Sequence, residues 1–485
     1  MTFTALSFVV FLVVFFGLYW RLRTKDTQNA LIVAGSYFFY GWWDWRFCSL
    51  MLFASCLDFS VALGMGKTDK RRWRRCLLGA SLAGNLGLLG FFKYFNFFAE
   101  SFAGLAGAIG WHVDPVTLRV ILPVGMSFYT FQELGYTIDV YRGKIKATSN
   151  LIELMAFISF FPQLVAGPIE RAHHMLPQCQ RRRVFSYPLA VQGCRQILWG
   201  FFKKIVMADN LGIYVHGIYG NPATHTGPQL ALATFCFAFQ IYCDFSAYSD
   251  IALGTARLLG FDLMRNFAYP YFSQTVGEFW RRWHISLSTW FRDYVYIPLG
   301  GSHVGPFLRT LNLLATFGIS GLWHGASWNF VIWGAGNGAC VIPTALAGSG
   351  KKVRHTDVPG GTRLLPGPLT LLRMLRTFLI ILVAWVFFRA TTLSDSLLIL
   401  RKMFTELWQP QAWHGLFGAS MRTQGMLLLL LPVFILVEWA SRAQPHPLNL
   451  DCWPRAIRWG VYTALIWGSL CLAAPQTGQF IYFQF

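Results

Sequence analysis

Long apolar stretches recur throughout this chain of 485 residues, and short polar or basic loops separate them. Several approach the roughly 20 residues that an α-helix needs to cross a bilayer. Only 13% of the residues are charged, against about 25% in an ordinary soluble domain. A water-soluble fold would not cover so much apolar surface, whereas helices in a bilayer satisfy their backbone groups internally. The sequence therefore predicts an all-α protein that crosses the membrane several times.

The candidate spanning segments are distributed over the whole chain. They comprise residues 3–20, 29–43, 48–65, 77–97, 119–136, 189–214, 229–259, 311–347, 371–388, 426–440 and 457–474. The stretch 311–347 is too long for one crossing, so we expect two helices broken near Gly321. The first segment has its basic residues after the apolar run, which favours a retained helix over a signal peptide. We expect one integral membrane domain over residues 1–485, with residues 348–368 as its clearest loop.

The formal net charge of +20 could suggest a nucleic-acid partner, but the placement of the basic residues argues against one. They cluster in short loops, above all at 67–75 and 181–183, as expected for cytoplasmic loops of a membrane protein. Such loops also attract anionic lipid headgroups. The ten cysteines form no C-x-x-C pair and no zinc spacing, so we expect no metal site.

Two segments do not fit plain membrane crossings. Residues 151–166 are apolar but have basic residues on both sides, which predicts a re-entrant segment that breaks at Pro162, Gly167 and Pro168. Irregular backbone at membrane depth survives only inside protein or beside a wet cavity. Residues 279–298 combine charges with seven aromatic side chains, which predicts an interfacial or re-entrant helix.

Two of the eleven histidines stand out by their surroundings. His324 lies in the apolar run SGLWHGASWNFVIWG between two glycines, Gly321 and Gly325, which would let a substrate or another backbone approach. His284 lies in RRWHIS. An ionisable side chain at membrane depth is costly and by default suggests a functional site. A core histidine bonded to a neighbouring helix, for His324, and an interfacial histidine beside headgroups, for His284, remain alternatives.

A third polar cluster, QIYCDFSAYSDIALG, contains Asp244 and Asp250. Carboxylates inside membranes normally pair or line water. The two aspartates are therefore candidates for substrate binding, with a structural ion pair as an equally favoured alternative. Arg257, Arg265 and the pair at 281–282 are the expected partners. Walker, G-x-S-x-G and H-E-x-x-H motifs have no suitable setting, so no motif favours ATP-driven, serine-triad or metalloprotease chemistry.

Six stretches together resemble the membrane-bound O-acyltransferase family, specifically its bacterial alginate O-acetyltransferase-like branch. They are SYFFYGWWDWRF (36–47), LPVGMSFYTFQELGYTIDVYRG (122–143), FFPQLVAGPIER (160–171), QIYCDFSAYSDIALG (240–254), EFWRRWHISLSTWFRDYVYIPLGG (278–301) and GLWHGASWNFVIWG (321–334). The resemblance lies within residues 36–334, and the helices expected over 371–474 resemble the family only in being helices.

The resemblance implies a multi-helix bundle around a central tunnel in the bacterial inner membrane, with no tightly bound cofactor. His324 and His284 match the two histidines of the family motifs. Relatives of this branch take an acetyl group from a cytoplasmic thioester, here expected to be acetyl-coenzyme A or an acyl carrier, and pass it outward. A periplasmic acetyltransferase of the same pathway then modifies an exopolysaccharide such as alginate or cellulose, in association with a synthesis and export complex.

Physical chemistry is consistent with these expectations. A neutral imidazole, with an ordinary pKa of about 6.5, suits the removal of a proton from an acceptor hydroxyl. Trp323, Trp328 and Asn329 are candidate donors to the developing oxyanion, and Arg281 and Arg282 are candidates for holding the phosphates of coenzyme A. Two rival functions stay open: a transporter or flippase for a polysaccharide or lipid, and a non-catalytic scaffold of an export complex.

Overall fold

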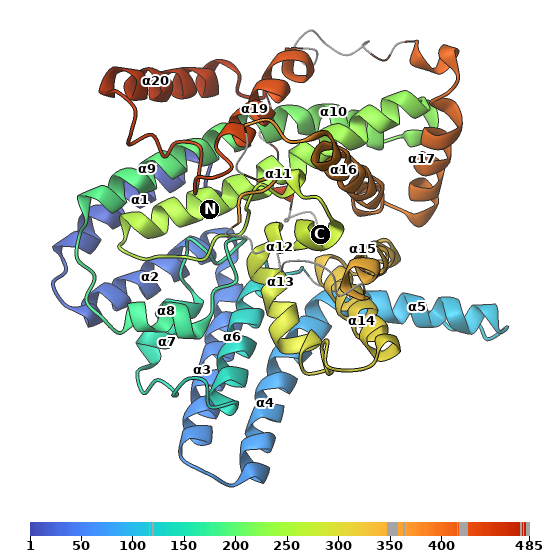
Figure 1. Cartoon of the computed structure of the whole chain (residues 1–485). Helices are drawn as coiled ribbons and strands as arrows, with labels where there is room; N and C mark the ends of the chain where they lie inside the picture. Colours follow the sequence, from blue (N-terminus) through green and yellow to red (C-terminus); the bar gives the residue numbers. More distant parts are fainter. Residues whose placement is uncertain are drawn as a thin grey trace. The chain divides into compact units, whose positions relative to one another are not determined.

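The structure is a computed structural model of the chain. It describes residues 1–485 except 116, 119–120, 347–356, 362–363, 415, 417–424, 476–477, 479 and 482–485. Every regular element among the described residues is helical (Figure 1). The prediction of an all-α membrane protein is therefore confirmed. Most of the expected loop at 348–368 lies outside the described residues.

The described residues divide into two compact units. Unit 1 contains residues 1–193 and 252–264, and unit 2 contains residues 194–251 and 265–485. Helices α9 (Tyr187–Phe202) and α11 (Gly227–Leu258) contribute residues to both units. The expectation of one domain over the whole chain stays a prediction.

Unit 1 is built from the N-terminal helices. They are α1 (Leu6–Arg21), α2 (Lys25–Asp44), η1 (Trp45–Phe47), α3 (Cys48–Gly66), α4 (Arg71–Leu89), η2 (Gly90–Tyr94), α5 (Phe95–Ala108), α6 (Met126–Tyr141), α7 (Leu151–Ile158) and α8 (Ala172–Cys179). Helices α3, α4 and α6 pack together, and α6 is buried along nearly its whole length. The hydroxyl of Ser55 on α3 donates to the carboxylate of Glu133 on α6 (3.1 Å).

The segment 151–166 has the irregular, buried backbone that the sequence predicts. Helix α7 ends at Ile158, and turns follow through Gly167. Gln163 supports these turns by donating from Nε2 to the carbonyl of Phe157 (2.7 Å). Residues 153–154 and 156–172 are buried. The re-entrant path across one leaflet stays a prediction.

Unit 2 contains the remaining elements. They are η3 (Lys203–Ala208), α10 (Asp209–Tyr219), η4 (Pro222–Thr224), η5 (Pro270–Phe272), α12 (Val276–Arg282), α13 (Ile285–Phe291), η6 (Arg292–Tyr296), α14 (Pro306–His324), α15 (Trp328–Leu346), α16 (Pro368–Arg389), α17 (Leu393–Glu406), η7 (Pro410–Trp413), η8 (Met426–Leu430), α19 (Leu431–Ala440) and α20 (Arg455–Cys471), together with most of α11. The expected interfacial helix at 279–298 is a run of three short helical segments, α12, α13 and η6.

The stretch 311–347 forms two helices, but the break differs from the expected one. Helix α14 continues through Gly321 and ends at His324, and α15 begins at Trp328. Gly321 stays helical because it lies against α15: a Cβ there would overlap the carbonyl oxygen of Phe330. The glycine expected to break the helix instead lets two helices approach closely, as small residues do in membrane proteins.

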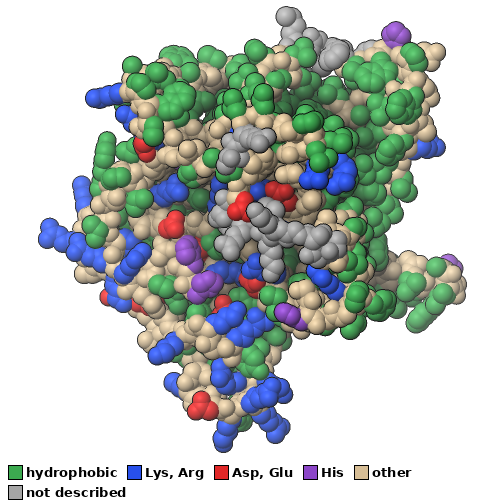
Figure 2. Space-filling model, in the orientation of Figure 1, with side chains coloured by type: hydrophobic (Ala, Val, Ile, Leu, Met, Phe, Trp, Pro, Cys, Tyr) green, Lys and Arg blue, Asp and Glu red, His purple; other side chains and the backbone are tan. Residues whose placement is uncertain are grey.

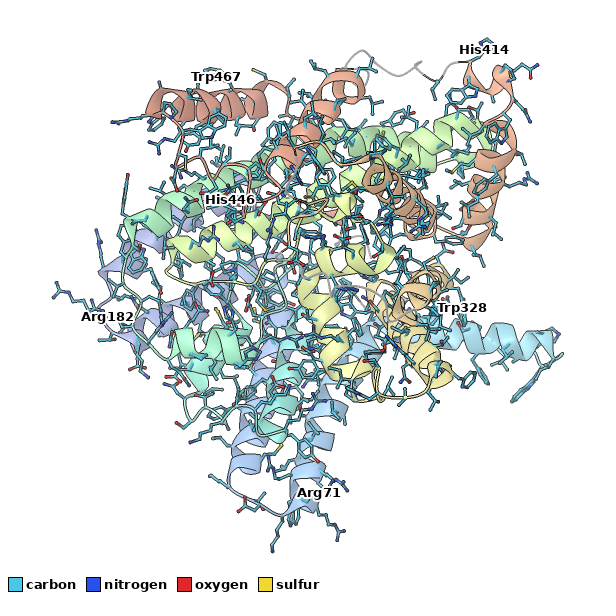
Figure 3. All side chains as sticks on the ribbon, viewed as in Figure 1. Arg71, Arg182, Trp328, His414, His446 and Trp467 are labelled. Carbon is cyan, nitrogen blue, oxygen red and sulfur yellow. The ribbon has the colours of Figure 1, made fainter. Side chains whose placement is uncertain are left out.

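Among the described residues, four helical segments are long and apolar enough to cross a membrane: Lys25–Gly66, Arg71–Ala108, Gly227–Leu258 and Pro368–Arg389. Leu6–Arg21 and Met426–Ala440 are shorter apolar helices. Basic side chains gather at the loop between α3 and α4 (Figure 2), beside Arg71, which Figure 3 labels. This separation of apolar helices from a basic loop agrees with a multi-pass membrane protein.

Candidate active site

The structure brings the two singled-out histidines together within unit 2. The ring centroids of His284 and His324 lie 6.5 Å apart. His284 is 1% exposed and His324 is 4% exposed. The indole of Trp323 contacts both rings, with centroid distances of 5.9 Å to His284 and 4.9 Å to His324. Two histidines that are 40 positions apart in the sequence thus share one buried, aromatic-lined site.

His324 is held at the end of a tight helical hairpin. It is the last residue of α14, and Gly325 begins the connection to α15. A Cβ at Gly334 of α15 would overlap the carbonyl oxygen of Phe317, so the two helices are in backbone contact near the site. The imidazole of His324 contacts the rings of Trp333 and Phe388, with centroid distances of 5.0 Å and 5.5 Å. Close helix packing therefore fixes the direction in which His324 points.

His284 occupies an unusual backbone conformation between α12 and α13. Its φ of 43° and ψ of 57° are left-handed, and only one other described non-glycine residue, Tyr269, has a positive φ. Such a conformation costs energy and is concentrated at functional sites. The ring of Phe245 on α11 lies 4.6 Å from the imidazole. A strained residue in this position requires strong support from its surroundings.

Asn266 supplies that support. Its backbone carbonyl accepts from the N–H of Ile285 (2.9 Å), and its Oδ1 accepts from the hydroxyl of Ser286 (2.7 Å). Its Nδ2 donates to the hydroxyl of Ser249 on α11 (3.2 Å). Asn266 is 1% exposed. These hydrogen bonds connect the turn that carries His284 to the long helix α11. Asn266 was not among the residues singled out from the sequence.

Burial determines the charge of His284. The side chain is removed from water, which disfavours the imidazolium and lowers the pKa of His284 to about 3. His284 is therefore neutral at pH 7. A neutral imidazole has one N–H donor and one acceptor nitrogen, so His284 can polarise a carbonyl oxygen by hydrogen bonding, whereas it is a weak proton acceptor.

The candidate oxyanion donors lie at different places around the site. Trp323 is buried beside both histidines, as described above. Asn329 is also buried, and its Nδ2 donates to the carbonyl of Ala390 (3.0 Å). Trp328, which Figure 3 labels, is by contrast 57% exposed. Proximity in the fold therefore favours Trp323 as the donor, and its role stays a prediction.

The arginine pair at 281–282 splits into one exposed and one buried side chain. Arg281 is exposed, and its expected contact with donor phosphates stays a prediction. Arg282 is 1% exposed, and its Nε lies 2.9 Å from Oε1 of Glu278. Its Nη1 also donates to the carbonyl of Asp357 (2.9 Å). This geometry disagrees with the expectation that Arg282 holds phosphates at an open mouth, because its guanidinium is buried in an internal ion pair.

Asp244 and Asp250 pair with lysines rather than with the expected arginines. Nζ of Lys204 lies 2.7 Å from Asp244 and 2.8 Å from Asp209. Nζ of Lys203 lies 2.7 Å from Asp250 and donates to Ser246 at the same distance. Both lysines are 2% exposed. The geometry is that of the structural ion-pair alternative, and a substrate-binding role stays a prediction.

A π-helical turn explains how two consecutive lysines both face inward. Lys203 and Lys204 begin η3, which interrupts the α-helical path between α9 and α10. Consecutive residues of an α-helix point about 100° apart, whereas a π-bulge changes that direction locally and is common at functional sites. The sequence analysis missed these lysines, although a Lys–Lys pair inside the apolar stretch 189–214 is itself an unusual pattern.

A charged triad lies in unit 1. His174 Nδ1 lies 2.8 Å from Glu170 and its Nε2 lies 3.8 Å from Asp262. Asp262 and Glu170 together raise the pKa of His174 to about 10. The hydrogen bond from His174 in turn lowers the pKa of Asp262. His174 is therefore a permanent cation at neutral pH, which joins α8 to the segment after α11.

Comparison with known proteins identifies the family. The model of the membrane-bound O-acyltransferase family, MBOAT, matches residues 143–350, a range that includes both histidines. A probable alginate O-acetylase of Pseudomonas putida is 36% identical, over 98% of this chain and 98% of its own length. This chain belongs to the membrane-bound O-acyltransferase family.

Further relatives agree with this assignment. A probable alginate O-acetylase of Pseudomonas aeruginosa is 38% identical over 89% of this chain and 81% of its own length. A peptidoglycan O-acetyltransferase of Helicobacter pylori is 33% identical over 77% of this chain and 73% of its own length. This membrane-bound O-acyltransferase is therefore a multi-pass membrane enzyme, as the motifs predict.

Proposed function

We propose that this enzyme takes an acetyl group from acetyl-coenzyme A on the cytoplasmic side of the bacterial inner membrane and transfers it for O-acetylation of an exopolysaccharide. The pairing of two buried histidines, His284 and His324, is the observation that most supports this proposal. The relatives that are named alginate O-acetylases support an acetyl group and a polysaccharide such as alginate. Cellulose is a second candidate polymer.

The two histidines have different roles in this proposal. The oxygen of an acceptor hydroxyl attacks the thioester carbonyl, a C–O bond forms, and the C–S bond breaks. His324 accepts the hydroxyl proton and returns it to the leaving thiolate, so that protons balance over the cycle. His284, neutral because it is buried, donates a hydrogen bond to the carbonyl oxygen as negative charge develops there.

The proposed mechanism also assigns roles to residues beside the two histidines. Trp323, which contacts both rings, closes the site against water and is the second candidate donor to the oxyanion. Arg281, which is exposed, is the candidate for contact with the phosphates of coenzyme A. A periplasmic acetyltransferase and the components of polysaccharide synthesis and export are the expected partners, because a polymer outside the membrane must receive the acetyl group.

Acetyl transfer by purified protein tests this proposal. Full-length enzyme in detergent is supplied with acetyl-coenzyme A that is isotopically labelled in the acetyl group, together with polysaccharide oligomers and the periplasmic acetyltransferase of the pathway. We expect release of free coenzyme A and labelled ester. Transport of oligomers into vesicles without release of coenzyme A would favour the flippase. Full polymer acetylation in cells by a folded His324→Gln variant would favour the scaffold.

A further inference from the structure

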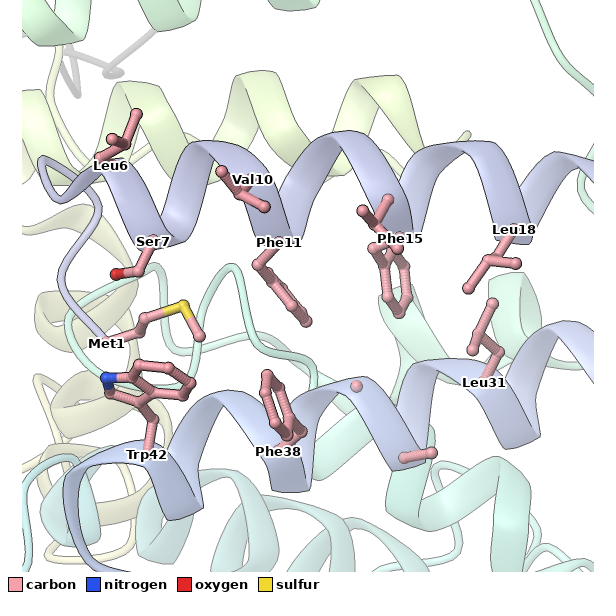
Figure 4. Close-up of a pocket in the computed structure, with 13 residues that line it drawn as sticks. Met1, Leu6, Ser7, Val10, Phe11, Phe15, Leu18, Leu31, Phe38 and Trp42 are labelled. Carbon is pink, nitrogen blue, oxygen red and sulfur yellow. The ribbon is translucent and has the colours of Figure 1, made fainter.

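An apolar groove lies between α1 and α2 in unit 1 (Figure 4). Its volume is about 630 Å³, within the range of about 300–1,000 Å³ for ligand pockets. One wall comes from α1, with Val10, Phe11 and Val14 among its side chains, and the other comes from α2, with Phe38 and Trp42. Because the exposed side chains along the groove, such as those of Val10, Val14, Phe38 and Trp42, are apolar, this groove is expected to open toward lipid.

Close packing of the two helices forms the floor of the groove. Phe15 of α1 lies directly over Gly35 of α2, where a Cβ would overlap the phenyl ring. Phe11 adds a stacked contact with Phe38 (6.0 Å between centroids). Above this floor, the outer side chains stay open, since Val10 is 57% exposed and Val14 is 56% exposed. The two helices are therefore in contact along the buried side of the groove, and the groove stays open on its exposed side.

Basic side chains cluster at one end of this groove. The α1 residues that line it recur every three or four positions up to Leu18, and the next position on that face is Arg21. Arg23 follows. Arg181 and Arg182 come from a segment that is far from α1 in the sequence. The next residue, Arg183, holds this segment against α1 and α2, because its Nε donates to the hydroxyl of Tyr19 (2.8 Å) and its backbone N–H donates to Oε1 of Gln28 (3.1 Å).

These four arginines, Arg21, Arg23, Arg181 and Arg182, are exposed. None of them forms an ion pair with a described residue. We propose that the groove binds an acyl chain of an anionic phospholipid, whose phosphate lies against this arginine cluster. The inference does not depend on the proposed acetyl transfer.

The dimensions favour an acyl chain over a protein helix. Leu6 to Leu18 covers about 18 Å of α1, close to the roughly 15 Å that one leaflet contributes to the hydrocarbon core. A helix about 10 Å wide and of the same length occupies roughly 1,400 Å³, more than twice the volume of the groove. Clustered arginines beside an apolar span are also the pattern that attracts anionic headgroups.

Native mass spectrometry of the full-length protein tests the headgroup. We expect phosphatidylglycerol to bind at least about tenfold more tightly than phosphatidylethanolamine with the same acyl chains. Arg21→Ala with Arg23→Ala should remove most of that preference. Lys70→Ala with Arg72→Ala, at the start of α4, is the matched control and should leave it unchanged. Equal binding of the two lipids, or equal effects of the two double variants, would overturn the proposal.

A photoreactive phosphatidylglycerol, with a diazirine on its acyl chain, tests the groove. Cross-links should map to α1 and α2. Val14→Trp, which fills the groove, should reduce them about tenfold, whereas Val13→Trp lies outside the lining and should not. Equal labelling of the two variants would contradict an acyl chain in the groove. Cross-links that map only to other parts of the chain would likewise contradict it.

Discussion

His284 and His324 face one another across a ring-centroid distance of 6.5 Å, deep inside unit 2. Their backbone settings differ, and the proposed mechanism gives the two residues different roles. His284 sits in a strained, left-handed turn against Phe245, whereas His324 ends a regular helix. A neutral hydrogen-bond donor beside a proton acceptor is the arrangement that acyl transfer from a thioester needs.

The turn at His284 depends on Asn266, and this dependence is testable. Asn266→Ala removes the acceptor of Ser286 and the donor to Ser249. We expect kcat to fall by about 10²-fold, because a small displacement of a catalytic group has effects of that size. Asn266→Asp retains the acceptor and should recover part of the rate. The measurement is kcat with melting temperature in detergent.

A double-mutant cycle separates positioning from general stability. If Asn266 acts through His284, adding Asn266→Ala to His284→Ala should cost little further rate. Asn312→Ala provides a control, because Asn312 is another buried asparagine, which donates to the carbonyl of Leu299 (2.8 Å). It should lower stability without changing kcat. Fully additive losses of rate would show that Asn266 does not act through His284.

The buried lysine pair predicts a large effect on stability. Lys204→Met leaves Asp209 and Asp244 without their shared cation, and breaking a buried pair costs about 3–5 kcal/mol. A further Asp244→Asn change should recover part of that loss. Arg46→Met breaks the solvent-exposed pair with Asp44 and should cost far less stability than Lys204→Met. Denaturant unfolding in detergent provides the comparison, and similar losses in the two single variants would contradict this account.

His174 predicts a pH-dependent contribution to the stability of unit 1. Its pKa is raised to about 10 in the folded protein by Asp262 and Glu170, against about 6.5 when unfolded. The stabilisation is therefore complete below pH 6.5 and is lost as the pH rises through 10. The melting temperatures of wild type and His174→Gln should differ most near pH 6 and converge near pH 10. A constant difference would contradict the ion pairs, and His414→Gln, at an exposed histidine, is the control.

Sequence patterns predicted the class of fold and singled out both histidines, because a costly side chain in an apolar run is visible without coordinates. The residues that contact the site residues could not be predicted as well from the sequence. Asp244 pairs with Lys204, 40 positions away, and a π-helical turn brings that lysine inward. Asn266 lies in a loop, and its hydrogen bond to Ser249 forms only when this loop packs against α11 in the folded protein. Gly321 was expected to break a helix, yet it packs two helices together.

The central claim is that His324 is the base of an acetyl-transfer site and His284 is a donor beside it. The most direct test is release of coenzyme A from acetyl-coenzyme A by three purified proteins with equal melting profiles: wild type, His324→Gln and His284→Gln. Glutamine keeps an N–H donor but accepts no proton at neutral pH. We expect His324→Gln to lose about 10²–10⁴-fold in kcat, and His284→Gln to retain clearly more. Near-wild-type turnover by His324→Gln would contradict the account.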